Sequence, residues 1–388
     1  MNELQKSLES KNFCNLQKIK EEIIGDHVYY GPIIWKILLG TVGLKPSNFE
    51  KDCVHSDIEY KLLFNYSFIN YLIEYFQTAD SQESPYKEND ISNNYHLIIM
   101  DKVEKDKLIE FYSNCSTSNE SLKSIGPQIS YPIDDLNFLN KLQNNFLSAL
   151  DQETMKKENI RLIYRHPLQI NSKILHQIHI DIKRLNPRSL NIKGVNISHM
   201  YYNILVLVSH RRPSLGYIQG MADILVPFIV EFSKENLSTA ESSAYFCYLK
   251  LLDRIQKYIS GLQTDLIFLL NSQLEKIDPD IFSFLKQSKL EIHMFAFRWF
   301  NCLYIREFPY ELYKKIFTTM LSYEKIGEFL IYFGVSLILK FKPELLKNGF
   351  SENIILLQTI NEFNWTEESI EELLKSTSVY FKTIGGFL

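Results

Sequence analysis

Residues 200–232 read MYYNILVLVSHRRPSLGYIQGMADILVPFIVEF. Two apolar segments, 200–209 and 218–232, lie on either side of the basic stretch HRRPSLGY. Apolar runs of this length, separated by residues that favour turns, are typical of two helices joined by a short connection. The stretch therefore predicts a helix, a turn and a second helix.

Later segments of the chain repeat this helical pattern. They are AYFCYLKLLDRIQKYI (244–259), LIFLLNSQLEKI (266–277), FAFRWFNCLYIREF (295–308) and EFLIYFGVSLILKF (328–341). Residues that break helices are scarce, because 14 Gly and 12 Pro make up 26 of 388 residues, about 7% against an ordinary usage of roughly 12%. Few turns and long elements favour an all-α fold over a β-sandwich or β-barrel.

The length of the chain indicates more than one packed region. A single hydrophobic core usually stops growing at about 250 to 300 residues, and this chain has 388. We expect an N-terminal helical extension at 1–26, followed by one domain of two helical lobes at 27–388. The first lobe is predicted to contain a polar insertion, rich in Ser and Asn, at about 78–135.

The first 76 residues contain three helical patterns. An amphipathic stretch is expected to end in a turn at Gly25-Asp26. A short apolar helix carrying Trp35 is predicted next, because Pro32 suits a first helical turn. From Tyr60, apolar residues recur at helical spacing and predict a long core helix.

Charge and cysteine content exclude several classes of protein. The formal net charge of −4 argues against a globally basic protein that binds nucleic acid. Five cysteines are scattered without a C-x-x-C pair, and the N-terminus lacks an apolar signal segment, so we expect a cytoplasmic protein with reduced thiols. No apolar stretch approaches the roughly 18 residues of a membrane-spanning helix, so any membrane contact is expected to be indirect, through a partner.

The chain lacks the common motifs of nucleotide hydrolases and zinc enzymes. No G-x-x-x-x-G-K-[ST], G-x-G-x-x-G, G-x-S-x-G or H-E-x-x-H occurs, so we do not expect the chain to hydrolyse a nucleotide alone. His176 and His179 lie three residues apart near Asp181, but no further ligand cluster accompanies them. We expect ordinary histidines on a helix face, no metal site and no cofactor of the chain's own.

A first candidate site lies in ILHQIHIDIKRLNP. Ile178, Asp181 and Arg184 fall on one helical face, because residues three apart are neighbours on a helix. Pro187 disfavours a helical conformation at the residue before it, which places Arg184 near a helix end, free to project outward with Asp181 steadying its stem. The simpler alternative is a surface ion pair worth a few tenths of a kcal/mol.

A second candidate site lies in RRPSLGYIQGMAD. Gly216 and Gly220 permit unusual backbone angles and close approach of a partner, and Gln219 offers an amide that can donate and accept hydrogen bonds. Such an amide can hold a water molecule in line with a phosphorus atom. A turn between helices with a solvated glutamine is the alternative. Arg211 and Arg212 add positive charge that suits either an acidic partner or a solvated surface.

Together these two stretches resemble the TBC domain, the catalytic domain of GTPase-activating proteins for Rab GTPases. Residues 178–184, IHIDIKR, match its I-x-x-D-x-x-R element, and residues 217–221, YIQGM, match its Y-x-Q-G-M element. The resemblance extends from about Val28 to Leu346 through PIIWKILLG, DILVPF and FAFRWFNCLYIREFP. Within the family, the segments QIHIDIKR and FAFRWFNCLYIREFP are most similar to the subgroup with Golgi-associated members.

The resemblance implies an all-α TBC domain of two lobes that accelerates GTP hydrolysis by a Rab in vesicle trafficking. Arg184 is then an arginine finger and Gln219 a glutamine finger that orients the attacking water. Asp181 and Tyr217 support the fingers and contact the partner, with Gly220 and Ile178 as further supporting residues. The partner is a GTP-bound Rab that brings its own magnesium and GTP. The expected location is the cytoplasm, peripheral on Golgi or other endomembranes.

The sequence departs from the family pattern at three positions. Gly31 replaces an arginine before the early Pro, Ala222 replaces an asparagine after Q-G-M, and Phe317-Thr318 replaces a Trp-Asp pair. We expect these changes to weaken hydrogen bonds that hold the loops or the second lobe. The alternative function is therefore a Rab-binding module or scaffold of the same fold with weak or no catalysis.

Overall fold

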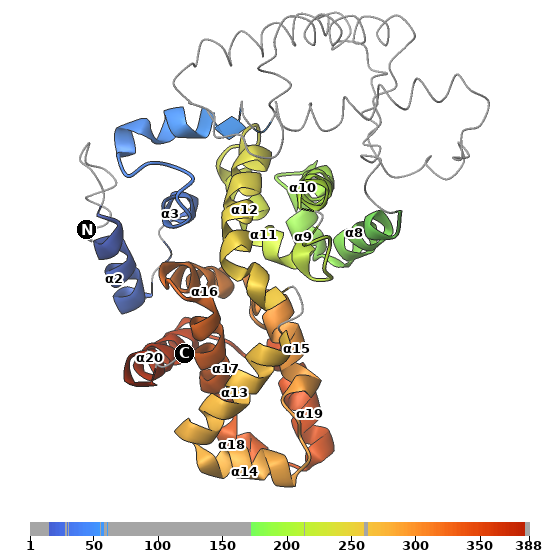
Figure 1. Ribbon diagram of the computed structural model, residues 1–388, viewed down its shortest axis with the longest axis vertical. Helices are drawn as coiled ribbons and strands as arrows, with labels where there is room; N and C mark the ends of the chain where they lie inside the picture. Colours follow the sequence, from blue (N-terminus) through green and yellow to red (C-terminus); the bar gives the residue numbers. More distant parts are fainter. Residues whose placement is uncertain are drawn as a thin grey trace, which may run out of the picture. The chain divides into compact units, whose positions relative to one another are not determined.

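The computed structural model of the protein describes residues 15–27, 29, 31–54, 56–57, 60, 172–212, 214–259 and 263–384. Helices dominate these residues, and the strands among them form one two-stranded hairpin (Figure 1). The predicted all-α class is confirmed. The helix expected to continue from Tyr60 and the insertion expected at about 78–135 fall outside the described residues.

The described residues group into two compact units. The large unit contains those of Met1–Asp52, Leu185–Ser189 and Ile218–Leu388, and the small unit contains those of Cys53–Arg184 and Leu190–Tyr217. This grouping is by packing and does not follow the order of the chain, so it does not test the extension proposed at 1–26 or the domain proposed at 27–388. Both stay predictions.

The large unit is built from helices. They are α2 (Leu16–Asp26), α3 (Pro32–Leu38), α11 (Met221–Glu235), α12 (Ala240–Ile259), α13 (Gln263–Ile277), α14 (Pro279–Gln287), α15 (His293–Asn301), α16 (Tyr310–Ser322), α17 (Ile326–Lys340), α18 (Lys342–Leu345), α19 (Phe350–Gln358) and α20 (Glu367–Ile384). Short 3-10 turns lie at η1 (Pro46–Asn48), η4 (Ile305–Glu307) and η5 (Ile360–Glu362). The later helical segments predicted from the sequence are confirmed at 244–259, 266–277 and 328–341. The helix expected at 295–308 is confirmed only as far as Asn301, because Leu303 and Tyr304 adopt left-handed conformations that end it.

Helix α17 lies at the centre of the large unit. It packs against α12, α13, α15, α16, α18 and α20 (Figure 1). Every residue from Ile326 to Ile338 is buried, as expected for a helix that is apolar around its whole circumference. Gly334 permits close packing there, because a Cβ atom at this position would lie 2.8 Å from the hydroxyl oxygen of Tyr304.

Trp35 joins α3 to the rest of the large unit. Pro32 opens the helix as predicted, and Gly31 before it adopts φ 93°. The fully buried Trp35 ring lies edge-on to Phe228 of α11 and to Phe317 of α16, with centroids 5.9 and 5.1 Å apart. These contacts bury an aromatic surface shared by three helices that are distant in sequence.

The described part of the small unit includes two longer helices and the hairpin. Helix α8 (Ser172–Arg184) packs on α10 (Ser198–Arg211), and β1 (Asn191–Ile192) pairs antiparallel with β2 (Val195–Asn196). The strands were not expected from the sequence. They form because Lys193 and Gly194 both take positive φ, 52° and 82°, which is the geometry of a tight two-residue hairpin turn.

The helix–turn–helix prediction for 200–232 is confirmed. Helix α10 ends at Arg211 and α11 begins at Met221, three residues after the predicted start at 218. The turn expected at Gly25-Asp26 is wrong by one or two residues, because α2 continues through Asp26 and His27 takes the left-handed conformation that ends it. Within the described residues, no helix is long and apolar enough to cross a membrane.

Candidate functional site

Arg184 is the last residue of α8, as Pro187 predicted. Pro187 is the first residue of the next helix, α9 (Pro187–Leu190). Ile178, on the same face as Arg184, is completely buried in the small unit, where α8 packs on α10. The Arg184 side chain is 54% exposed. The buried face thus fixes the helix while the guanidinium at its end reaches solvent.

Asp181 connects Arg184 to Tyr217 within the small unit. Its carboxylate is almost completely buried, and its Oδ2 accepts a hydrogen bond of 2.8 Å from the Tyr217 hydroxyl. Its Oδ1 lies 3.8 Å from Nη1 of Arg184. A contact of that length to an exposed arginine contributes about 0.2–1 kcal/mol at most, so it orients the side chain more than it stabilises the fold.

Gln219 lies in the turn before α11, in the large unit. Its side chain is exposed and has no hydrogen-bond partner among the described residues. The backbone around it is held more firmly. The Met221 amide donates to the Ile218 carbonyl over 3.1 Å, and the Met221 carbonyl accepts from the buried Tyr248 hydroxyl over 3.1 Å. An exposed amide therefore extends from a backbone that is held by hydrogen bonds.

Gly220 is the N-cap residue of α11 and adopts φ 100°. A Cβ atom there would lie 3.0 Å from the carbonyl oxygen of Asn301 and 3.3 Å from Sγ of Cys302. A side chain is therefore disfavoured for two reasons, the backbone angle and the close approach of a second backbone. This explains the glycine that follows Gln219.

Sequence reasoning assigned no role to Asp223 or Arg306. In the structure, Arg306 Nε and Nη2 donate to the two carboxylate oxygens of Asp223 over 2.8 and 2.7 Å. Asp223 is buried in the first turn of α11. A carboxylate buried within the apolar run DILVPF needs a cationic partner. The sequence could have indicated this need, but it could not show which arginine meets it.

The three departures from the family pattern have clear structural settings. Thr318 takes over a hydrogen-bonding role, because its Oγ1 accepts from Nε1 of Trp35 over 2.8 Å. Gly31 precedes α3 at a positive φ, and Ala222 is fully buried in the first turn of α11. Thr318 thus provides a hydrogen bond at this position, and the weakening expected from the three departures stays a prediction.

The predicted site residues divide between the two units. Ile178, Asp181, Arg184 and Tyr217 lie in the small unit, whereas Gln219 and Gly220 lie in the large unit. Among the described residues, no group of three or more His, Cys, Asp or Glu side chains is arranged to hold a metal ion. The chemistry that these side chains can perform is the stabilisation of negative charge by a guanidinium and the orientation of a small molecule by an amide.

Comparison with known proteins identifies the family. A sequence model of the Rab-GTPase-TBC domain matches residues 138–346, which is more than half of the chain. The chain belongs to the RabGAP-TBC family. The resemblance seen in the sequence is thus confirmed, and the match covers both Arg184 and Gln219.

Relatives of this TBC domain are found in fungi and animals. It is 27% identical over 259 residues to "GTPase-activating protein gyp1" of Schizosaccharomyces pombe, which covers 61% of this chain and 50% of that protein. It is 29% identical over 220 residues to human "TBC1 domain family member 22B", covering 51% and 44% of the two chains. The chain thus spans about half the length of the curated relatives it matches.

A solved structure shares the fold of this TBC domain. The Ypt/Rab-GAP domain of Gyp1p superposes with a TM-score of 0.65, covering 98% of this chain and 97% of the other at 19% identity. At that identity the likeness concerns the fold. It supports the all-α TBC architecture.

Proposed function

We propose that this protein is a GTPase-activating protein for a Rab-family GTPase. Membership of the RabGAP-TBC family carries the proposal. The exposed guanidinium at the end of α8 supports it, because a group that enters another protein's active site must project from a fixed support into solvent. The relative from S. pombe, itself named a GTPase-activating protein, agrees with it.

In the proposed mechanism, Arg184 is the arginine finger. During GTP hydrolysis negative charge develops on the oxygens around the transferred phosphoryl group, and a guanidinium placed there stabilises it. Such fingers increase the rate by roughly 10³ to 10⁵, about 4 to 7 kcal/mol of barrier. Asp181 and the Tyr217 hydroxyl keep the stem of the arginine oriented through the contacts described above.

Gln219 is the proposed second finger. Its amide has both a donor and an acceptor, which allows it to hold the attacking water in line with the γ-phosphorus. The exposed side chain and the firmly held backbone of its turn suit this role. Magnesium and GTP belong to the GTP-bound partner, so the chain requires no metal or nucleotide of its own. The proposed location is the cytoplasmic face of Golgi or other endomembranes.

The proposal is tested by measuring GTP hydrolysis by a broad panel of purified Rab proteins with and without the protein. At least one Rab is expected to hydrolyse GTP faster. Arg184→Ala and Gln219→Ala are each expected to lower kcat by about a thousandfold or more. Arg188→Ala removes another exposed arginine, in the neighbouring short helix, and is expected to leave kcat unchanged. No acceleration of any Rab would overturn the proposal.

The binding-module alternative predicts a different pattern. A scaffold of this fold binds GTP-loaded Rab without changing turnover, and its binding survives Arg184→Ala. Measuring Rab affinity and GTP hydrolysis with the same variants distinguishes the two functions, because loss of the Arg184 side chain lowers kcat only if the protein is a GTPase activator.

A further inference from the structure

Residues 301–306 run from the end of α15 into η4 and lie directly against the start of α11; this segment is called the 301–306 loop. Gly220 has no side chain, so its backbone approaches the Asn301 carbonyl and the Cys302 sulfur closely. The residue next to this contact is Gln219. The position of the loop therefore limits where the backbone of Gln219 can lie, because interiors packed at this distance have no room for adjustment.

A second contact joins the same loop to the first turn of α11. The planar guanidinium of Arg306 donates hydrogen bonds to both carboxylate oxygens of Asp223, a bidentate geometry that fixes orientation as well as distance. Cys302 adds to the contact, since its thiol lies 3.7 Å from Oδ2 of Asp223. Burial raises the pKa of that thiol, which keeps it protonated as a donor. The first turn of α11 is thus held at three points.

The loop itself has a defined and unusual conformation. Leu303 and Tyr304 are consecutive residues in the left-handed region, with φ 48° and 65°, and both are buried. Two tyrosines secure this backbone. Tyr313 donates to the Leu303 carbonyl over 2.9 Å, and Tyr304 donates to the Leu330 carbonyl of α17 over 2.9 Å. A sparsely populated conformation persists only where the surroundings enforce it, and such conformations cluster at functional sites.

A second ion pair in the same region provides the internal comparison. Arg298 Nε and Nη2 donate to the two carboxylate oxygens of Glu307, each over 2.7 Å, and Glu307 is fully buried. Arg298 also donates to the Gln358 carbonyl over 2.7 Å, which joins α15 to the end of α19. This pair has the same bidentate geometry as Arg306–Asp223, but it joins α15 to η4, whereas Arg306–Asp223 joins η4 to α11.

We propose that Asp223 and Arg306 are positioning residues for Gln219. They act through the backbone of the Ile218–Gly220 turn. By holding this backbone in place, they fix the position from which the Gln219 amide reaches the partner. The inference rests on the proposed function, because it assigns Gln219 a part in hydrolysis. It requires that loss of the pair change the placement of Gln219 rather than the binding of the partner.

The kinetic test compares Arg306→Lys and Asp223→Asn with the matched variant Arg298→Lys. Each of the two arginine variants loses one bidentate ion pair with a buried carboxylate. Arg306→Lys is expected to lower kcat by about ten- to a hundredfold, the effect of a misplacement near 1 Å, with KM for the GTP-bound Rab unchanged. Arg298→Lys is expected to leave kcat unchanged although it lowers the melting temperature. Equal losses of kcat in both variants, or a change in KM alone, would overturn the inference.

A double-mutant cycle separates positioning from general damage. In a Gln219→Ala background the amide is absent, so Arg306→Lys is expected to cause no further loss of kcat. Additive losses would show that Arg306 acts independently of Gln219 and would contradict the inference.

Hydrogen exchange tests the same inference without any GTPase. Amide exchange in a peptide covering 215–221 is expected to rise in Arg306→Lys and Asp223→Asn and to stay at the wild-type rate in Arg298→Lys. Unchanged exchange in all three would refute the positioning claim. If the protein accelerates GTP hydrolysis by no Rab but amide exchange changes as expected, the proposed function fails. The dependence of the Ile218–Gly220 turn on the Arg306–Asp223 pair would still stand.

Discussion

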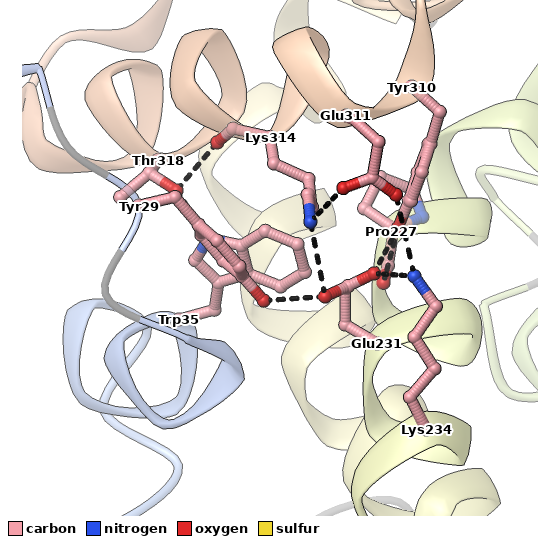
Figure 2. A network of polar contacts seen from close by, with 9 residues as sticks. All are labelled: Tyr29, Trp35, Pro227, Glu231, Lys234, Tyr310, Glu311, Lys314 and Thr318. Atoms are coloured by element: carbon pink, nitrogen blue, oxygen red, sulfur yellow. Dashed lines mark hydrogen bonds and ion pairs between the residues drawn. The ribbon is translucent and has the colours of Figure 1, made fainter.

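The hydroxyl of Tyr29 donates a hydrogen bond of 2.7 Å to Oε2 of Glu231, a carboxylate that is only 6% exposed (Figure 2). Tyr310 donates to the other oxygen over 3.2 Å, and Lys234 lies 2.7 Å from it. Lys314 lies 3.9 Å from Glu231 and sits over the Tyr29 ring, 4.8 Å from its centroid. One buried carboxylate thus joins the chain before α3 to α11 and α16.

Tyr29→Phe is expected to destabilise the fold by about 1–3 kcal/mol, because it leaves a buried carboxylate oxygen without its shortest neutral donor. Thermal or urea unfolding measures the change. Tyr310→Phe is the matched control and is expected to cost less, since its bond to Glu231 is longer. A Tyr29→Phe variant as stable as wild type would contradict the importance assigned to this bond.

Thr318→Val is expected to lower stability by about 1–3 kcal/mol, because the buried indole nitrogen of Trp35 then has no acceptor. The neighbouring Thr319 gives a matched control. It is equally buried, and its hydroxyl has no hydrogen-bond partner in the described part of the structure. Thr319→Val is expected to be neutral or slightly stabilising. Similar losses at both positions would contradict the explanation, as measured by urea unfolding.

Gly220→Ala and Gly216→Ala separate backbone strain from close packing. Both glycines have positive φ, 100° and 61°, but a Cβ atom at Gly216 meets nothing within 4 Å. Gly216→Ala is expected to cost about 1 kcal/mol from its left-handed backbone alone. Gly220→Ala adds roughly 1–3 kcal/mol of overpacking against Asn301. Urea unfolding measures both, and equal losses would argue against the packing contact.

Arg184→Ala is expected to change stability by less than about 1 kcal/mol, because its contact with Asp181 is long and the arginine is exposed. The same variant is expected to abolish the proposed activation of a Rab. Asp181→Ala is expected to lower both stability and activity, because it removes the acceptor of the buried Tyr217 hydroxyl. A large loss of stability in Arg184→Ala would favour a structural role for the arginine.

Stability is expected to fall on mild acidification because of His27. Burial, and then the charge of Lys375, lower its pKa, although Glu371 and Asp26 oppose the shift. The folded state therefore favours the neutral ring. The contribution of His27 is complete above the unfolded pKa of about 6.5 and is lost as the pH falls below it. His27→Asn suits the left-handed φ of 51° and is expected to flatten the profile of melting temperature between pH 5 and 7.5. If the melting temperature of His27→Asn falls with pH as steeply as that of the wild type, groups other than His27 cause the loss of stability.

Local features of the sequence predicted the elements well. Pro187 correctly placed the end of α8 near Arg184, and the glycines flanking Gln219 correctly indicated a turn before α11. Helix ends and turns depend on side chains within a few residues, which the sequence displays directly. The two-residue strands at Asn191 and Val195 were missed, because segments so short leave no periodic pattern to detect.

The sequence by itself determined the all-α class, the helix on which Arg184 stands and the turn that carries Gln219, because these follow from local periodicity and helix-ending residues. Only the tertiary structure decided which side chains support them. Arg306 and Asp223 are 83 residues apart, Tyr29 and Glu231 are 202 apart, and Trp35 and Thr318 are 283 apart. Each pair meets because packed helices leave one partner within reach of a buried polar group. That choice depends on the geometry of packing, which the order of residues along the chain does not display.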